Sequence, residues 1–278
     1  MIEIGKYNVL EVLRDTSSGL FLGGDEEEDQ DVLLPGNYIP EGTSIGDKIE
    51  VFIYNDSEDR VIATTLKPKI TLHQFACLQV KMVTKMGAFL DWGLNKDLFV
   101  PFREQNGRMQ EGRYYVVYLY LDKETNRLVA SSKVNRFLYN QALTVEEGEE
   151  VDVLFWETTD LGMNVIINHV HKGLVYHNEL FSKVKPGDIR KGYIKKIRED
   201  NKIDVTLQKP GYQNTEPNAQ RILSKLKEED GFLPLGDHSS PAEITRQLEM
   251  SKKTFKKAIG LLYKQRVIRL EKDGIYLN

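Results

Sequence analysis

The sequence has few of the residues and segments that several protein classes require. Cys77 is the only cysteine among 278 residues, which excludes an internal disulfide and any zinc site with two or more thiolates. We interpret it as a small buried hydrophobic residue. No apolar run reaches the roughly 18 residues of a membrane-spanning helix, and no basic segment followed by an apolar one opens the chain. We therefore expect a globular cytoplasmic protein without a membrane segment or a secretory signal.

Motifs for catalysis and metal binding are also missing. The chain has no phosphate-binding glycine-rich loop, no Gly-x-Ser-x-Gly and no His-Glu-x-x-His. His169 and His171 lie two residues apart, but no cysteine or close carboxylate completes a metal set, so we assign them a surface or turn role. The acidic run over residues 25–29 is interpreted as a solvated loop, and contact with a basic neighbour is the alternative. We expect no metal, no cofactor and no small-molecule substrate.

The net charge of −4 conceals an asymmetry along the chain. Residues 1–67 carry 5 basic and 15 acidic residues, whereas residues 68–143 carry 11 and 6. Residues 144–216 carry 10 and 13, and residues 217–278 carry 12 and 8. Two regions are therefore basic, and an anionic polymer is a suitable partner for them despite the negative total. We expect the acidic first segment to contribute little to such binding.

Three segments of the chain follow one plan. Each has a glycine, then a proline or tyrosine 14 to 16 residues later, a second glycine 11 residues after that, and a lysine 21 or 22 residues further on. The landmarks are Gly19, Pro35, Gly46 and Lys67 in the first, Gly87, Pro101, Gly112 and Lys133 in the second, and Gly162, Tyr176, Gly187 and Lys209 in the third. Spacings that agree this closely indicate a threefold internal repeat.

Each repeat contains short β-branched and aromatic stretches, such as residues 51–54 and 114–119, followed by turn residues. Five strands in about 65 residues, with a glycine that lets an early strand bend, suit a small closed barrel. The sequence therefore predicts a mostly β protein. We place its three five-stranded barrels at residues 1–67, 68–143 and 144–210.

Two segments of the repeats resemble a known domain family. Residues 173–180 (GLVYHNEL) resemble the Gly-Leu-Val-His-x-Ser-Glu signature of S1 RNA-binding domains, which are five-stranded OB-fold barrels. Residues 86–90 (MGAFL) resemble their Phe-Gly-Ala-Phe-Val strand. The resemblance extends over residues 1–209. At the position of the signature histidine, this sequence has Pro35, Pro101 and Tyr176 in the three repeats. Not every barrel therefore needs to bind RNA.

The C-terminal residues 217–278 predict a winged helix. We expect a helix over about residues 217–229, a second that begins at Pro241, and a third that Ser251 caps. Strands at residues 267–270 and 275–277 flank Asp273-Gly274, which is a hairpin signal. This order is typical of the winged helix, a helix-turn-helix variant. Residues 211–218 predict a linker. Three S1-like barrels followed by a winged helix resemble the conserved virulence factor B family, the YitL-like proteins of Gram-positive bacteria.

We expect a non-catalytic RNA-binding protein that holds single-stranded RNA by base stacking and by cations. The family resemblance implies a cytoplasmic regulator of gene expression, including virulence-associated genes. A DNA-binding transcriptional regulator that uses the winged helix is the alternative, and a nuclease is a third possibility for which no carboxylate set stands out.

The candidate RNA-binding residues lie in the second barrel, the third barrel and the last helix. At Tyr176 the S1 histidine normally faces the ligand, whereas Phe89 and Phe99 have a core role as the competing interpretation. We expect lysines of the third barrel and of the last helix to form one cationic path. The candidates are Phe89, Phe99, Tyr176, His177, Arg190, Lys191, Lys195, Lys196, Arg198, Lys252, Lys253, Lys256, Lys257, Lys264 and Arg266.

Overall fold

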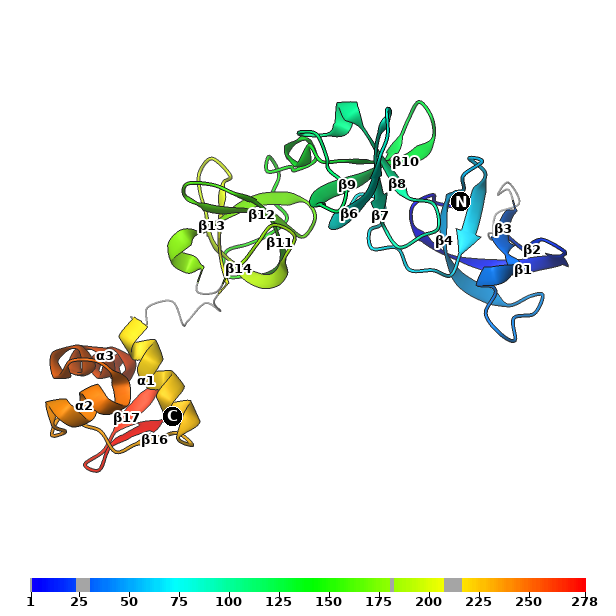
Figure 1. Ribbon diagram of the computed structural model, residues 1–278. Helices are drawn as coiled ribbons and strands as arrows, with labels where there is room; N and C mark the ends of the chain where they lie inside the picture. The colour runs from blue at the N-terminus through cyan, green and yellow to red at the C-terminus, as the bar shows by residue number, and fades with distance from the viewer. Residues whose placement is uncertain (1, 24–30, 181–182, 208–216) are drawn as a thin grey trace. The chain divides into compact units, whose positions relative to one another are not determined.

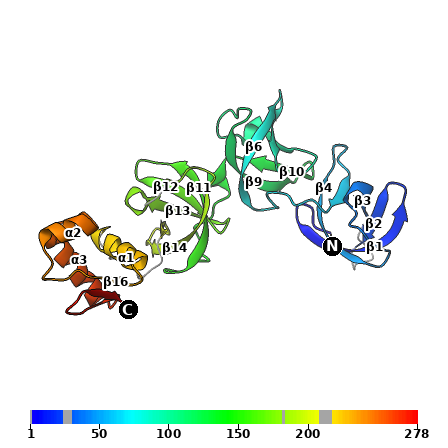
Figure 2. The same ribbon diagram turned by 60° about the horizontal axis from the view of Figure 1, so that its bottom comes forward.

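The computed structural model describes residues 2–23, 31–180, 183–207 and 217–278. The chain forms two compact units, Met1–Leu207 and Gln208–Asn278. The first contains three five-stranded sheets, and the second contains three α-helices and a small sheet (Figures 1 and 2). The acidic run 25–29 and residues 211–216 of the expected linker lie outside the described residues. No helix in the described ranges is long and apolar enough to cross a membrane.

The first and third sheets are closed barrels with the same strand order, β1-β2-β3-β5-β4 and β11-β12-β13-β15-β14. The first is built from β1 (Tyr7–Thr16), β2 (Gly19–Gly23), β3 (Val32–Pro35), β4 (Lys48–Asn55) and β5 (Val61–Thr64). The third is built from β11 (Glu150–Thr158), β12 (Gly162–Ile167), β13 (His171–Tyr176), β14 (Ile189–Ile197) and β15 (Ile203–Thr206). Each closes through a parallel pairing, β3 with β5 and β13 with β15.

The second sheet has the equivalent order β10-β9-β6-β7-β8. Its strands are β6 (Phe75–Val83), β7 (Gly87–Asp91), β8 (Leu98–Pro101), β9 (Tyr114–Asp122) and β10 (Arg127–Ser131). The strands β8 and β10 lie against each other, although no hydrogen-bonded register joins them in the described part of the chain. The predicted mostly β fold with three S1-like barrels is thus confirmed, and the second barrel is the less completely closed one.

Short 3-10 helices add to the repetition. In each barrel one follows the third strand directly: Gly36–Tyr38, Phe102–Glu104 and His177–Glu179. Another, Val134–Arg136, lies in the connection between the second and third barrels.

The second repeat glycine has the same backbone role in all three barrels. Its φ is +92° at Gly46, +75° at Gly112 and +99° at Gly187, a region that favours glycine. Its N–H donates to a carbonyl beside a β-bulge of the first strand, at 2.7 to 2.8 Å. The acceptors are Val12, Val80 and Phe155. The constant spacing of the repeat follows from this conserved turn.

The first repeat glycine is required by the close approach of two strands. A Cβ atom at Gly19, Gly87 or Gly162 would lie 2.1, 2.3 or 2.1 Å from a carbonyl oxygen of the neighbouring third strand. A side chain of any size would therefore push the second and third strands apart. These strands carry the outer face on which the candidate site lies.

Residues of β4 and β5 of the first barrel join the hydrophobic cluster of the second barrel, whereas the interior of the first barrel forms a separate cluster. Phe52 and Tyr54 of β4 lie edge-on to Trp92 of the second barrel, with ring centroids 5.9 and 6.2 Å apart. The cluster continues into the interior of the second barrel. The N–H of Leu72 donates to the carbonyl of Gly5 at 2.8 Å and ties the two barrels further. The repeat pattern did not predict this contact.

A smaller cluster joins the second and third barrels. Phe75 packs with Ile166, and its N–H donates to Nδ1 of His169 at 3.0 Å. His171 is fully buried, with Nδ1 2.5 Å from the carbonyl oxygen of Tyr139. A surface role is therefore wrong for His171, which holds the connecting segment on the third barrel. His169 lies in a turn, as expected.

The C-terminal unit has the winged-helix order. Its elements are α1 (Pro217–Glu228), β16 (Phe232–Leu233), α2 (Pro241–Leu248), α3 (Lys252–Lys264), β17 (Ile268–Leu270) and β18 (Ile275–Leu277). Ser251 caps α3 as predicted, because its Oγ accepts the N–H of Thr254 at 3.1 Å. A capping box of Ser240 and Glu243 begins α2. The three helices bury one common cluster, and the added strand β16 was not predicted.

Candidate nucleic-acid interface

Two phenylalanines of the second barrel form an aromatic pair on its outer face. Phe89 of β7 lies directly opposite Phe99 of β8, with ring centroids 5.0 Å apart and ring planes inclined by 35°. Their neighbours Leu90 and Val100 are buried in the barrel, so the alternation of the strands turns both rings outward. The rings are half-buried and line a cavity of about 370 Å³, called here the first cavity.

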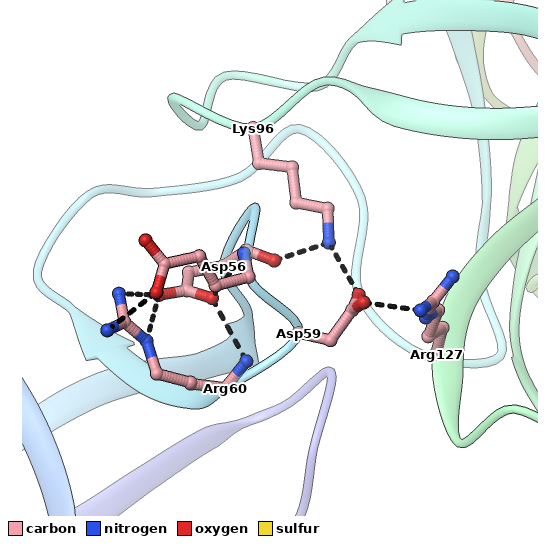
Figure 3. Close-up of polar contacts among 6 residues, drawn as sticks. Asp56, Asp59, Arg60, Lys96 and Arg127 are labelled. Carbon is pink, nitrogen blue, oxygen red and sulfur yellow. Dashed lines mark hydrogen bonds and ion pairs between the residues drawn. The ribbon is translucent and has the colours of Figure 1, made fainter.

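The first barrel also contributes to the lining of the first cavity. Tyr54 and Asn55 at the end of β4, and Ser57 and Asp59 in the loop before β5, contribute to it. Figure 3 shows the side chain of Asp59 between Lys96 and Arg127 of the second barrel.

Hydrogen bonds fix this loop on the second barrel. The Nζ atom of Lys96 donates to the carbonyl of Asp56 at 2.6 Å and lies 3.4 Å from Oδ1 of Asp59. The other carboxylate oxygen of Asp59, Oδ2, accepts a hydrogen bond from Arg127. Burial acts to raise the pKa of Asp56, but hydrogen bonds from Arg60 hold that pKa below its ordinary value (Figure 3). Two anionic side chains are thereby kept in place within one loop.

The third barrel has a cavity of about 520 Å³ at the equivalent place, called here the second cavity. Tyr176 at the end of β13 is half-buried, and its hydroxyl accepts a hydrogen bond from Arg198. Arg198 also bonds to Asp204 at 2.8 Å, and this hydrogen bond raises the pKa of the guanidinium. Asn164 and Leu174 occupy the positions that the two phenylalanines have in the second barrel.

The first barrel covers its own aromatic residue. Phe21 of β2 lies opposite Leu33 of β3, and the guanidinium of Arg14 lies 4.1 Å from the centroid of its ring. Arg14 in turn pairs with Asp31 at 3.2 Å. The guanidinium of Arg14 thus already occupies one face of the Phe21 ring.

The cations predicted along β14 lie apart from the second cavity. Lys191 pairs with Asp152 at 2.9 Å, and Lys195 pairs with Glu179. Arg190 donates to the carbonyl of Lys183, Lys196 is exposed, and Nε2 of the exposed His177 lies 3.1 Å from the carbonyl oxygen of Thr159. Of the predicted residues of this barrel, Tyr176 and Arg198 are the ones that line the second cavity within the described residues.

The winged helix presents a row of lysines on α3. Lys253, Lys256, Lys257 and Lys264 are exposed, whereas Lys252 is half-buried. Lys256 pairs with Asp237 at 3.2 Å, and the exposed Arg266 follows the helix. Tyr263 on the same helix is 56% exposed. Tyr263 was not among the predicted residues, although its spacing of seven from Lys256, which places both on one helix face, was a signal for it.

Other residues of the first cavity were missed for a different reason. Asn55, Lys96 and Arg127 come from separate turns and strands of two repeats. Asn55 directly follows the β-branched and aromatic stretch at residues 51–54, but no local pattern indicates which segment of another repeat it faces. Met86, 68% exposed, also lines this cavity and immediately precedes the repeat glycine.

Comparisons with known proteins agree with this architecture. The S1 domain family matches residues 4–66 and 74–133, and the CvfB-like winged helix domain family matches residues 220–277. Conserved virulence factor B of Staphylococcus aureus strain USA300 is 26% identical over 99% of this chain and 94% of its own length. The protein of that name from strain bovine RF122 / ET3-1 is 25% identical with the same coverage.

A solved structure is similar along the chain as well. It is a multidomain protein with nucleic acid binding domains from Streptococcus pneumoniae TIGR4, which is 23% identical, covers 99% of this chain and 98% of its own, and has a TM-score of 0.44. The S1 domains indicate nucleic-acid binding. The chain thus contains S1 domains and a CvfB-like winged helix domain, and it is similar over nearly its whole length to conserved virulence factor B of Staphylococcus aureus.

Proposed function

We propose that this protein binds single-stranded RNA without catalysing a reaction on it, and that it regulates gene expression, including virulence-associated genes. The observation that carries the proposal is the Phe89–Phe99 pair, two outward rings beside a cavity on the face of an S1 barrel. An unpaired base stacked on an aromatic side chain contributes about 1–3 kcal/mol of binding free energy. The names of the staphylococcal relatives support the part that concerns virulence.

Stacking and charge have separate roles in this proposal. The rings of the second barrel and Tyr176 of the third accept bases, and every base has a face that stacks, so sequence preference is modest. The exposed lysines of α3 contact phosphates. A duplex keeps its bases stacked on one another and offers none to the rings.

Titration of the full chain with single-stranded RNA, single-stranded DNA and duplexes of matched length, each at two salt concentrations, tests the proposal. We expect the tightest binding to single-stranded RNA and weaker binding at the higher salt. Equal affinity for a blunt duplex and a single strand would contradict it. The RNA recovered after incubation is expected to be intact, and cleavage would contradict the non-catalytic role.

A DNA-binding regulator is the second candidate, and α3 favours it. The last helix of a helix-turn-helix variant commonly enters the major groove, and here it exposes lysines. Tighter binding to duplex DNA than to single-stranded RNA would establish this candidate.

Replacement of four lysines of α3 tests the role of that helix on either ligand. We expect the variant with Lys252, Lys253, Lys256 and Lys257 all changed to Ala to bind more weakly. The salt slope is the slope of the logarithm of the binding constant against the logarithm of the salt concentration. In this variant its magnitude should fall by about 0.7 for each lost contact to a single strand and by about 0.9 for each lost contact to a duplex. The same four positions changed to Arg keep the charge and serve as the control. An unchanged slope in the alanine variant would mean that the helix face is merely solvated.

A further inference from the structure

We infer that the first cavity is a pocket for one nucleobase, whose ring lies against Phe89 and Phe99 and whose polar edge bonds to Asn55. The inference rests on the proposed binding of RNA. It adds that the acidic first barrel takes part, since it supplies the group that meets the edge of the base.

Asn55 is a buried amide without a full set of partners. The residue is 8% exposed, it lines the first cavity, and none of the described residues provides a hydrogen-bond partner for Oδ1. Folded proteins rarely leave such an atom unpaired, because burial removes it from water without compensation. An N–H group of a ligand would satisfy it once the amide turns toward the cavity that Asn55 lines.

The lining of the cavity favours a flat uncharged group. Its charged residues within the described chain are Asp59, Asp97, Lys96 and Arg127, two of each sign. Both cations bond to Asp59, and Asp97 is paired with Lys81 at 2.8 Å. A phosphate therefore meets no net positive charge there, whereas the two phenylalanine rings offer apolar contact.

The amide and the rings are held at a fixed separation although they come from different barrels. Trp92 packs between the barrels against Phe52 and Tyr54 of β4, the strand that ends in Asn55. Asp59, bonded to Lys96 and Arg127, fixes the loop that follows (Figure 3). A site arranged in advance loses little free energy in ordering itself around a ligand.

An apolar side chain of a protein partner is a poorer occupant. It would contact the rings but leave Oδ1 of Asn55 unpaired, and the cost of that buried atom would persist. A nucleobase meets both requirements, because it combines an aromatic face with an edge of N–H donors.

The test compares Asn55→Leu with the unchanged full chain. Leucine has a similar size but forms no hydrogen bond, so we expect unchanged or higher thermal stability and about tenfold weaker binding of a short single-stranded RNA. A strand of equal length with base-free riboses should bind both proteins equally. Asn55→Ala repeats the test without added bulk. The matched control is Asn8→Leu, whose amide bonds to backbone carbonyls of the first barrel.

The outcomes separate the two proposals. If the unchanged protein fails to bind RNA, both the proposed function and the base pocket are wrong. If it binds RNA but Asn55→Leu binds as tightly, the base pocket alone is wrong. Equal weakening for the normal and the base-free strands would mean that Asn55 acts through the fold, which also overturns the inference.

Discussion

At the facing positions of their second and third strands, the second barrel has Phe89 and Phe99, whereas the third has Asn164 and Leu174. Both barrels have a cavity there, and in each case residues that precede the barrel form part of the wall. The first cavity presents two rings, and the second presents Tyr176 with its bonded guanidinium.

The difference shows that one backbone can carry two kinds of contact. Stacking on the phenylalanine pair changes little with salt, since no ion is released. The second cavity combines one ring with a charged network of Arg198 and Asp204. We therefore expect the second barrel to provide most of the salt-independent affinity.

Removal of the aromatic pair should have the largest effect. We expect Phe89→Ala combined with Phe99→Ala to weaken binding of single-stranded RNA by about 1–3 kcal/mol, roughly 5- to 150-fold, because one stacked base is lost. The salt slope should stay constant, as titration at two salt concentrations will show. Phe21→Ala is the control, since Arg14 already covers that ring. An equal loss in the control would end the distinction between the barrels.

Changes at Tyr176 probe the single ring of the third barrel. Tyr176→Ala should weaken binding toward the lower end of about 1–3 kcal/mol if one base stacks there. Tyr176→Phe keeps the ring and loses only the hydrogen bond from Arg198, so its affinity should stay within about threefold of the original. Titration of both variants with one RNA decides the matter. Full affinity of the alanine variant would remove the third barrel from the stacking surface.

Introducing a phenylalanine pair into the third barrel should strengthen binding instead of weakening it. Asn164→Phe combined with Leu174→Phe should raise the affinity for RNA by at most about tenfold. Both positions are half-buried on the outer face, so the melting temperature should change little. The bond of Asn164 to Glu157 at 2.8 Å is lost, and Asn164→Ala controls for that loss. A gain in the alanine control as well would show that the new rings are not its cause.

The junction before the third barrel should also respond to pH. Burial lowers the pKa of His169, although Asp152 acts in the opposite direction. The neutral ring is thus favoured in the folded state, and this stabilisation is complete above the ordinary value of 6.5. As pH falls below 6.5, the unfolded chain binds the proton first, and stability decreases until the lowered pKa is passed.

Thermal unfolding at several pH values between about 7.5 and 5 measures this smallest effect, at most about 1.4 kcal/mol per pH unit. His169→Asn retains an acceptor for the N–H of Phe75 and should remove this part of the pH dependence. A variant that loses stability on acidification as steeply as the original protein would show that His169 is not responsible.

The fold was predictable because the residues that recur in each repeat are ones that the backbone of each barrel requires. The glycines that set its spacing make the same hydrogen bond or the same close approach in each barrel. The pairing of the predicted cations was not predictable from local pattern. Lys191 meets Asp152 because these residues lie directly opposite on β14 and β11, and a register between strands 39 residues apart is settled only when the barrel closes.

The first cavity escaped prediction for a related reason. Phe89 and Phe99 were identified from their place in the S1-like strands, but Asn55 belongs to the preceding repeat. Each repeat was treated as a barrel with its own interior. The aromatic contacts of Trp92 with Phe52 and Tyr54 show that the first two are not independent.

That apolar contact between the first two barrels limits how this architecture can change during evolution. Loss of the first repeat would leave Trp92, now 2% exposed, open to water. The apolar residues of the winged helix are buried in a cluster that, within the described residues, contains no residue of the barrels. We expect related proteins either to contain both of the first two barrels or to lack both. The C-terminal unit, in contrast, can be replaced as an independent domain.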